Sequence, residues 1–163
     1  MGPDVHEGRS RVVKGVVRGA LVAAAYVAVS YVLAPISFGP FQFRLAEGLT
    51  LLPMIFPEAV AGLFVGCLVT NLIGPYGLPD IVFGSLVTLV AAVITRAFRG
   101  SPVAYLSPVV LNAVFVSAYL TFLTGVPYWT LVLSIGASEA VSVLAVGVPL
   151  LRFAGRRWQR GEN

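Results

Sequence analysis

The sequence of residues 103–124 is VAYLSPVVLNAVFVSAYLTFLT, a stretch with no Asp, Glu, Lys or Arg. A membrane-spanning helix needs about 20 mostly apolar residues to cross roughly 30 Å of hydrocarbon, and this stretch meets that requirement. The whole chain has the same character, because 58% of its 163 residues are hydrophobic, 11% are charged and the mean hydropathy is +0.91. A soluble domain carries about a quarter charged residues. The composition therefore indicates an integral membrane protein and excludes a water-soluble globule or a disordered chain.

Proline and glycine divide the chain into six apolar segments, with clear breaks at Pro57, Gly74–Pro75 and Gly100–Pro102. We predict an all-α integral membrane protein with six transmembrane helices, at about 15–35, 43–56, 58–74, 80–98, 103–124 and 130–152. This membrane domain, 15–153, lies between a polar tail, 1–14, and a basic tail, 154–163. The second helix is too short for a perpendicular crossing unless its ends extend into the loops.

Three clusters of basic residues predict the orientation of these helices. They comprise Arg9, Arg11, Lys14 and Arg18, then Arg96 and Arg99, then Arg152, Arg156, Arg157 and Arg160. With six crossings and a cytoplasmic N-terminus, all three clusters face the cytoplasm, as the positive-inside rule requires. An odd number of crossings would place one cluster outside. We therefore expect both termini to be cytoplasmic.

The chain carries few groups suited to metal or acid–base chemistry. Cys67 is the single cysteine and lies in an apolar run, and the single histidine, His6, lies in the polar tail. These counts exclude a disulfide framework and a Cys/His metal site. No GxxxxGK[ST] phosphate loop and no GxSxG motif occurs in the sequence. We expect no metal, no cofactor, no nucleic-acid partner and no enzymatic activity, and the lipid bilayer is the expected environment.

Polar residues inside the predicted helices are candidate ligand-binding groups, because a charge at mid-bilayer costs roughly 2.5–3.5 kcal/mol. Glu139 in the sixth helix and Asn112 in the fifth lie at similar predicted depths. We expect the two side chains to meet in one pocket. The alternative for Glu139 is a structural contact with Ser138, Ser142 or Asn112.

Four other polar residues have a structural and a functional interpretation. Arg44 and Glu47 are three residues apart and can pair on one helix face, which would anchor the second helix. An interhelical hydrogen bond would satisfy Asn71. Asp80 follows a proline and precedes an apolar run, a pattern typical of a helix N-cap.

The predicted outer links, 35–43, 75–80 and 124–129, are rich in aromatic residues, proline and glycine. Gln42, Tyr76, Tyr128 and Trp129 lie there. Tyr128 and Trp129 can form an interfacial belt at the membrane surface. The functional alternative is a lid over an outward-facing pocket.

Small residues predict close helix contacts. Ala20, Ala24 and Ala28 recur every four residues in the first helix, Gly15, Gly19 and Ala23 form an adjoining face, and Gly62 and Gly66 repeat the spacing in the third. Such spacing lets helix backbones approach closely. We expect about half of these faces to be internal, which leaves one face of the first helix for a partner.

The segment APISFGPFQFRLAE, residues 34–47, resembles the first outer loop of the QueT family. The resemblance continues through Leu51-Leu52-Pro53, GLFVGC at 62–67, Asn71-Leu72, DIVFGSL at 80–86, Asn112 and the segment around Glu139, and it covers roughly residues 15–153. Members of this family are queuosine-precursor substrate-binding subunits of energy-coupling-factor (ECF) transporters.

The resemblance implies a six-helix subunit of the cell membrane that captures a 7-deazaguanine (preQ1, preQ0 or queuine) from outside. It also implies two kinds of partner, a membrane coupling subunit and two cytoplasmic ATPase subunits, whose ATP hydrolysis drives release of the ligand inward. Ala20, Ala24 and Ala28 match the AxxxA pattern of the family and would dock on the coupling subunit. Two alternatives stay open, a related subunit for another vitamin-like ligand and a membrane assembly protein without a ligand.

The candidate site residues suit a guanine-like ring. One carboxylate can accept the adjacent N–H donors of such a ring, as in the recognition of flipped bases. Glu139 is the first candidate for that role, followed by Glu47 and Asp80, and Asp80 is the candidate for a cationic aminomethyl group. The ring carbonyl and nitrogens would be bound by Asn112, Gln42, Asn71 or Arg44. Aromatic stacking on the ring would come from Phe41, Tyr76 or Trp129.

Overall fold

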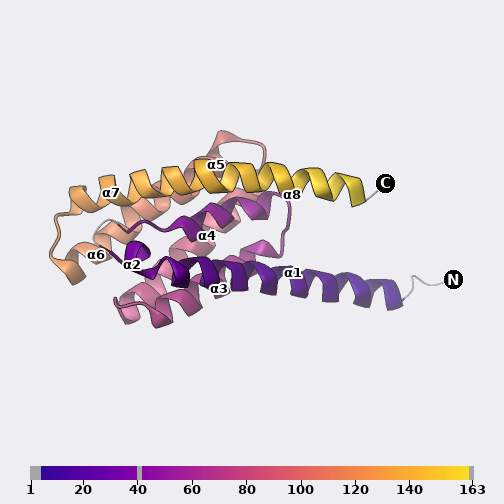
Figure 1. Ribbon diagram of the computed structural model, residues 1–163, viewed down its shortest axis with the longest axis horizontal. Coiled ribbons are helices and arrows are strands. Elements are labelled where there is room, and N and C mark those ends of the chain that lie inside the picture. Colours follow the sequence, from indigo (N-terminus) through magenta and orange to yellow (C-terminus); the bar gives the residue numbers. More distant parts are fainter. Residues whose placement is uncertain (1–4, 40–41, 162–163) are drawn as a thin grey trace.

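The computed structural model describes residues 5–39 and 42–161, and every regular element in that part of the chain is a helix (Figure 1). The elements are α1 Val5–Val32, α2 Ala34–Ser37, η1 Leu45–Met54, α3 Ala59–Ile73, η2 Asp80–Gly84, α4 Ser85–Ala97, α5 Pro102–Leu111, η3 Asn112–Val116, α6 Ser117–Thr124, α7 Tyr128–Val141, η4 Ser142–Gly147 and α8 Val148–Gly161. The element η1 is a 3₁₀-helix, and η2, η3 and η4 are π-helical segments inside longer helices.

Four continuous helical segments are long and apolar enough to cross a membrane, namely Gly8–Val32, Asp80–Ala97, Pro102–Thr124 and Tyr128–Arg156. Two shorter apolar helices, Leu45–Met54 and Ala59–Ile73, occupy the positions of the second and third predicted helices. The chain is therefore a multi-pass, all-helical membrane protein. The count of six crossings remains a prediction.

The second predicted helix differs most from the expectation, because it is a 3₁₀-helix of 10 residues. A 3₁₀-helix rises about 2.0 Å per residue, so ten residues cover about 20 Å where an α-helix would cover about 15 Å. Close packing accompanies this slender helix: a Cβ on Gly48 would lie 2.8 Å from the Ser142 carbonyl oxygen, and one on Gly147 would lie 2.8 Å from the Gly48 carbonyl oxygen. The short segment is therefore the centre of the bundle.

Burial confirms the central position of η1. Residues 46–53 are all buried, and η1 contacts α1, α3, α4, α5, α7, η4 and α8. Polar residues on this helix, Glu47 and Thr50, therefore face the interior of the protein.

The helices α1 and α3 pack closely side by side (Figure 1). A Cβ on Gly66 would lie 2.8 Å from the Cβ of Tyr26, and a Cβ on Gly19 would lie 3.2 Å from the Glu58 carbonyl oxygen. The glycine face of α1 thus packs against α3 and is half-buried. Ala20, Ala24 and Ala28 are exposed, so the predicted division of α1 into a packed face and an open face is confirmed.

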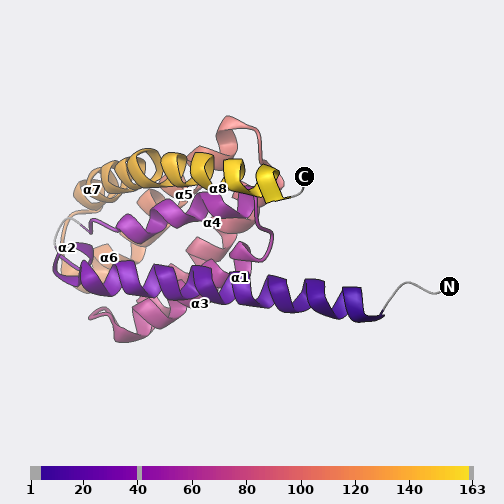
Figure 2. The ribbon, with the colours of Figure 1, turned by 45° about the vertical axis from the view of Figure 1, so that its right-hand side comes forward.

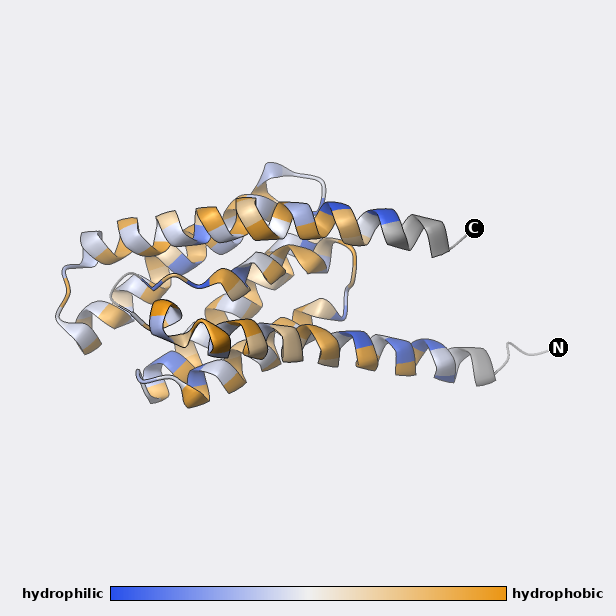
Figure 3. Ribbon diagram, in the orientation of Figure 1, coloured by the Kyte–Doolittle hydropathy of each residue, from blue (hydrophilic) through white to orange (hydrophobic). Residues whose placement is uncertain are grey.

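Both described ends of the chain lie at the same end of the bundle, and α1 extends past the bundle there (Figures 1 and 2). Hydrophilic residues of α1 and α8 gather toward that end (Figure 3). The second basic cluster joins them, because Arg96 donates a hydrogen bond of 3.2 Å to the Pro53 carbonyl oxygen, and Arg18 pairs with Glu58 at 3.2 Å. Arg18 of the first basic cluster and Arg96 of the second therefore both contact residues 53–58.

Candidate substrate-binding site

Three helices are interrupted by π-helical segments that each begin at a buried polar residue. The segments η2, η3 and η4 start at Asp80, Asn112 and Ser142. π-helical turns are rare and occur frequently at functional sites. The interruptions mark the interior of the bundle as the place to look for a site.

Arg44 and Glu47 form the predicted ion pair, with 3.7 Å between Nη2 and Oε1. The pair is buried and belongs to a larger network, because the Tyr26 hydroxyl donates to Glu47 Oε1 at 2.6 Å and Thr88 Oγ1 lies 3.4 Å from the same oxygen. Arg44 Nη2 also donates to the Tyr26 hydroxyl at 3.4 Å. Tyr26 of α1 and Thr88 of α4, which are far apart in sequence, therefore hold one carboxylate together with the nearby Arg44.

The network continues through α3 to η2 and α6. Cys67 Sγ accepts from Arg44 at 3.6 Å and from Asn71 Nδ2 at 3.4 Å. Asn71 Nδ2 also donates to the Asp80 carbonyl oxygen at 2.9 Å, which confirms the predicted interhelical bond. The Asp80 carboxylate accepts from the Tyr119 hydroxyl at 2.6 Å. Asp80 is not an N-cap, because the helix already begins at Leu78.

Gly84 makes room for this part of the network. A Cβ at this position would lie 2.8 Å from Asn71 Nδ2, 2.8 Å from Asp80 Oδ1 and 2.9 Å from the Tyr119 hydroxyl. Any other residue here would displace those groups.

A second set of buried polar atoms has no hydrogen-bond partner among the described residues. It comprises both carboxyl oxygens of Glu139, both amide atoms of Asn112, Oε2 of Glu47, Oδ1 of Asn71, Oγ of Ser117 and Oγ1 of Thr70. A buried polar group without a partner costs about 1–3 kcal/mol, and more when it is charged. Several buried polar atoms without hydrogen-bond partners are typical of a site where a bound ligand supplies the missing hydrogen bonds.

Glu139 is the centre of this set. The Asn112 amide lies beside its carboxyl group, and Arg44 and Glu47 are near enough to act on it electrostatically, yet it makes no well-formed hydrogen bond to a described residue. The adjacent Ser138 accepts from the Arg44 backbone N–H at 3.2 Å and donates to the Gln42 carbonyl oxygen at 3.1 Å. One turn of α7 therefore anchors the outer loop and presents the carboxyl group. The structure brings Glu139 and Asn112 together, as predicted.

The outer loop enters the bundle beside Tyr76. Gln42 is buried and has φ 49°, a left-handed conformation that non-glycine residues rarely adopt and that is often found at functional sites. Tyr76 is half-buried next to it and donates to the Phe38 carbonyl oxygen at 3.0 Å. Partial burial raises the pKa of the Tyr76 phenol, so its hydroxyl stays a donor at neutral pH.

Trp129 is not part of this cluster. Its side chain is 73% exposed and packs edge-on against Tyr128, with ring centroids 5.1 Å apart. The two rings lie at the start of α7 on the surface, as interfacial aromatics do. Phe41, the other predicted stacking residue, lies outside the described residues.

Sequence reasoning missed Tyr26, Cys67, Thr88, Tyr119 and Ser117. Each lies in an apolar run, where a hydroxyl or thiol adds little to a hydropathy pattern. The sequence did hold a signal for Thr88: Ser85 lies three residues earlier, so two polar side chains share one face of an otherwise apolar helix. The structure buries both of them.

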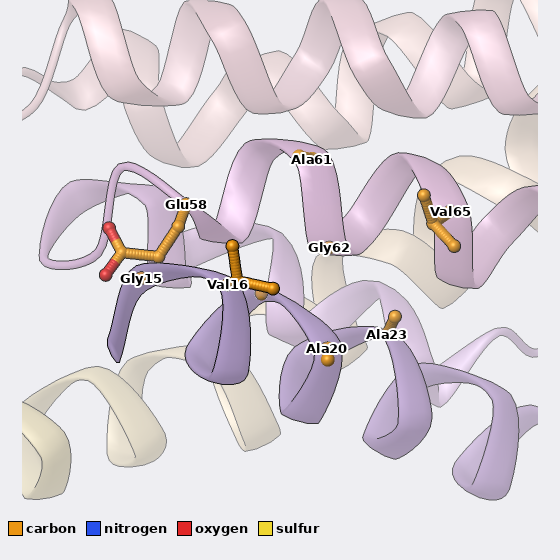
Figure 4. Close-up of a pocket in the computed structure, with 9 residues that line it drawn as sticks. Gly15, Val16, Ala20, Ala23, Glu58, Ala61, Gly62 and Val65 are labelled. Atoms are coloured by element: carbon orange, nitrogen blue, oxygen red, sulfur yellow. The ribbon is translucent and has the colours of Figure 1, made fainter. Parts of the chain in front are cut away.

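A groove of about 400 Å³ lies elsewhere, on the surface between α1 and α3 (Figure 4). Its walls are the small residues of the two helices, among them Gly15, Ala20, Ala23 and Gly62, and Glu58 is its charged residue. An apolar groove of this kind does not suit a polar ring, so the interior cluster is the better candidate for ligand binding.

Comparisons with known proteins agree on one family. The sequence profile described as QueT transporter matches residues 16–156. A curated relative, the queuosine precursor transporter QueT of Lactococcus lactis subsp. cremoris (strain MG1363), is 34% identical over 73 residues. That match covers 44% of this chain and 43% of the relative, so the chain matches less than half the length of that protein. No solved structure matches the chain.

Proposed function

This chain belongs to the QueT transporter family, and from that premise we propose that it is the membrane subunit that captures a queuosine precursor for uptake. The proposed ligand is a 7-deazaguanine such as preQ1, preQ0 or queuine. The proposed location is the plasma membrane, with both termini in the cytoplasm. ATP hydrolysis would take place on separate partner subunits, because the chain itself has no phosphate-binding loop.

The observation that carries this proposal is the fully buried carboxyl group of Glu139, which lacks a hydrogen-bond partner among the described residues. Its geometry suits a ligand edge with two adjacent N–H donors, and the neighbouring Asn112 amide can bind a ring carbonyl or nitrogen. Both groups lie on helices and not on loops, so their positions are well defined before a ligand arrives.

Charge supports a cationic member of the ligand class. Three acidic side chains, Glu47, Asp80 and Glu139, are buried among the described residues, against one buried basic side chain, Arg44. Unpaired buried charge is strongly unfavourable, and a cationic aminomethyl group on the ligand would offset it. PreQ1 carries such a group, so we expect it to bind more tightly than the neutral preQ0.

The exposed face of α1 is the proposed contact with a membrane coupling subunit. Ala20, Ala24 and Ala28 form this face, and their small side chains permit close approach of a partner helix. Two cytoplasmic ATPase subunits would complete the ECF transporter.

Calorimetric titration of the detergent-purified chain tests the capture role. PreQ1, preQ0 and queuine are the probes, with riboflavin and biotin as controls. We expect saturable binding of a deazaguanine at about one per chain and a loss of at least tenfold in affinity for Glu139→Gln. Glu58→Gln is the matched control, because this half-buried acid pairs with Arg18 and does not contact the interior polar cluster. Binding of a control vitamin alone would overturn the proposed substrate class. Absence of binding by a folded sample would overturn the capture role.

A further inference from the structure

The helix α1 is the least buried of the four long apolar segments. In its most apolar 18-residue stretch 17% of the residues are buried, whereas the share is 39% in the corresponding stretch of each of the other three. Tyr26 lies on its buried face, between Val22 and Ser30, and its side chain is 0% exposed. Ala24 and Ala28 are each two residues away, about 200° around the helix, so they lie on the opposite, exposed face.

The Tyr26 hydroxyl contacts the candidate site directly. It donates to Glu47 Oε1 at 2.6 Å, and the Arg44 guanidinium donates to it at 3.4 Å. The second oxygen of the same carboxylate, Oε2, is buried without a partner among the described residues. One side of Glu47 is therefore held by α1, and the other is left for a ligand.

The position of this hydroxyl depends on how α1 lies against α3. A Cβ on Gly66 would come within 2.8 Å of the Tyr26 Cβ and 3.1 Å of the Ala23 carbonyl oxygen, so the two backbones are in contact at this point. A hydrogen bond of 2.6 Å is lost when the atoms separate by about an ångström. A small shift of α1 therefore releases Glu47.

We propose that Tyr26 is a positioning residue, whose hydroxyl orients the Glu47 carboxylate for the ligand and makes the affinity of the site depend on where α1 lies. The inference rests on the proposed capture function. A partner that docks on the exposed face and shifts α1 would lower the ligand affinity through this one bond. Linkage then requires that bound ligand disfavours the shifted position of α1 to the same degree.

Removal of one hydroxyl group tests the proposal. We expect Tyr26→Phe to weaken preQ1 binding to the purified chain about tenfold, since a hydrogen bond to a charged group is lost. The matched control is Tyr31→Phe on the same helix, where the ring is 66% exposed. Its affinity should stay within twofold of that of the unaltered chain.

A double-mutant cycle separates positioning from general packing. In a Glu47→Gln background, Tyr26→Phe should change the affinity less than twofold, because the group through which it acts is already altered. Equal losses in both backgrounds would overturn the proposal, and so would unchanged affinity of Tyr26→Phe. Failure of the unaltered chain to bind preQ1, preQ0 and queuine would instead overturn the capture function on which the inference rests.

A second variant tests the dependence on α1 without altering Tyr26. Gly66→Ala inserts a methyl group between the helices and should lower the affinity at least fivefold. Gly15→Ala is its control at the same interface, because the nearest side-chain atom there is 3.9 Å away. Equal affinities of these two variants would exclude a role for the position of α1, even if Tyr26→Phe fails to fold.

Discussion

The contact of α1 with α3 and the contact of η1 with its neighbours are both built on glycine, yet they differ in what the close approach achieves. At the α1–α3 contact, Gly62 and Gly66 bring two apolar helices together with few polar groups between them. At the centre, Gly48 lets η1 pack against η4, and Gly84 leaves room for the polar side chains of η2 and its neighbours, in an interior where several polar atoms remain unpartnered among the described residues. The first contact serves stability and the placement of Tyr26, and we infer that the second sacrifices stability for binding.

The largest effect is expected at the α1–α3 contact. Gly62→Val should prevent correct folding, because even a Cβ at this position overlaps the Gly19 carbonyl oxygen. Overpacking of this kind costs about 1–3 kcal/mol or more. Size-exclusion profile and melting temperature of the purified variant are the measurements. A monodisperse sample with an unchanged melting temperature would show that this contact is not tightly packed.

The opposite sign of stability change is expected at the centre. Glu139→Gln should abolish most ligand binding and leave the melting temperature of the ligand-free protein unchanged or higher, because it removes a buried acid that lacks a partner. Calorimetry and thermal unfolding, on the same sample, check both parts. A lower melting temperature would mean that the carboxyl group stabilises the fold, and the contrast between the two regions would fail.

An intermediate effect is expected where the satisfied and unpartnered groups adjoin. Gly84→Ala would push on Asn71, Asp80 and Tyr119, so we expect a loss of about 1–3 kcal/mol in stability together with weaker binding. The two readouts should change together here, unlike those of Glu139→Gln. A loss of stability with unchanged binding would show that this network serves packing alone, and weaker binding with unchanged stability would show that it serves binding alone.

The smallest effect is expected at the surface. Trp129→Ala should leave ligand affinity within twofold, because the ring is 73% exposed and lies apart from the polar cluster. Titration with preQ1 checks this. A larger loss would show that the outer aromatic residues close over the ligand, which is the lid interpretation of that loop.

Parts of the candidate site could be predicted from the sequence, and others could not. Glu139 and Asn112 are conspicuous in apolar runs because their burial in a membrane needs a reason. Tyr26 and Tyr119 were not conspicuous, because a phenol is common at membrane interfaces and its hydroxyl is informative only when the partner is known. The 3₁₀ form of η1 was also missed, since its apolar residues are compatible with either helix type.

The membrane environment, the positions of the apolar segments, the two faces of α1 and the family all follow from the order of the amino acids. Each of these depends on composition or on local spacing, which act within one or two helical turns. The packing of the helices places the shortest apolar segment at the centre of the bundle. It also sets the Glu47 carboxylate against α1 and leaves that of Glu139 without a partner among the described residues. Hydrogen bonds between residues 21 to 96 positions apart depend on how helices pack, which no local pattern specifies.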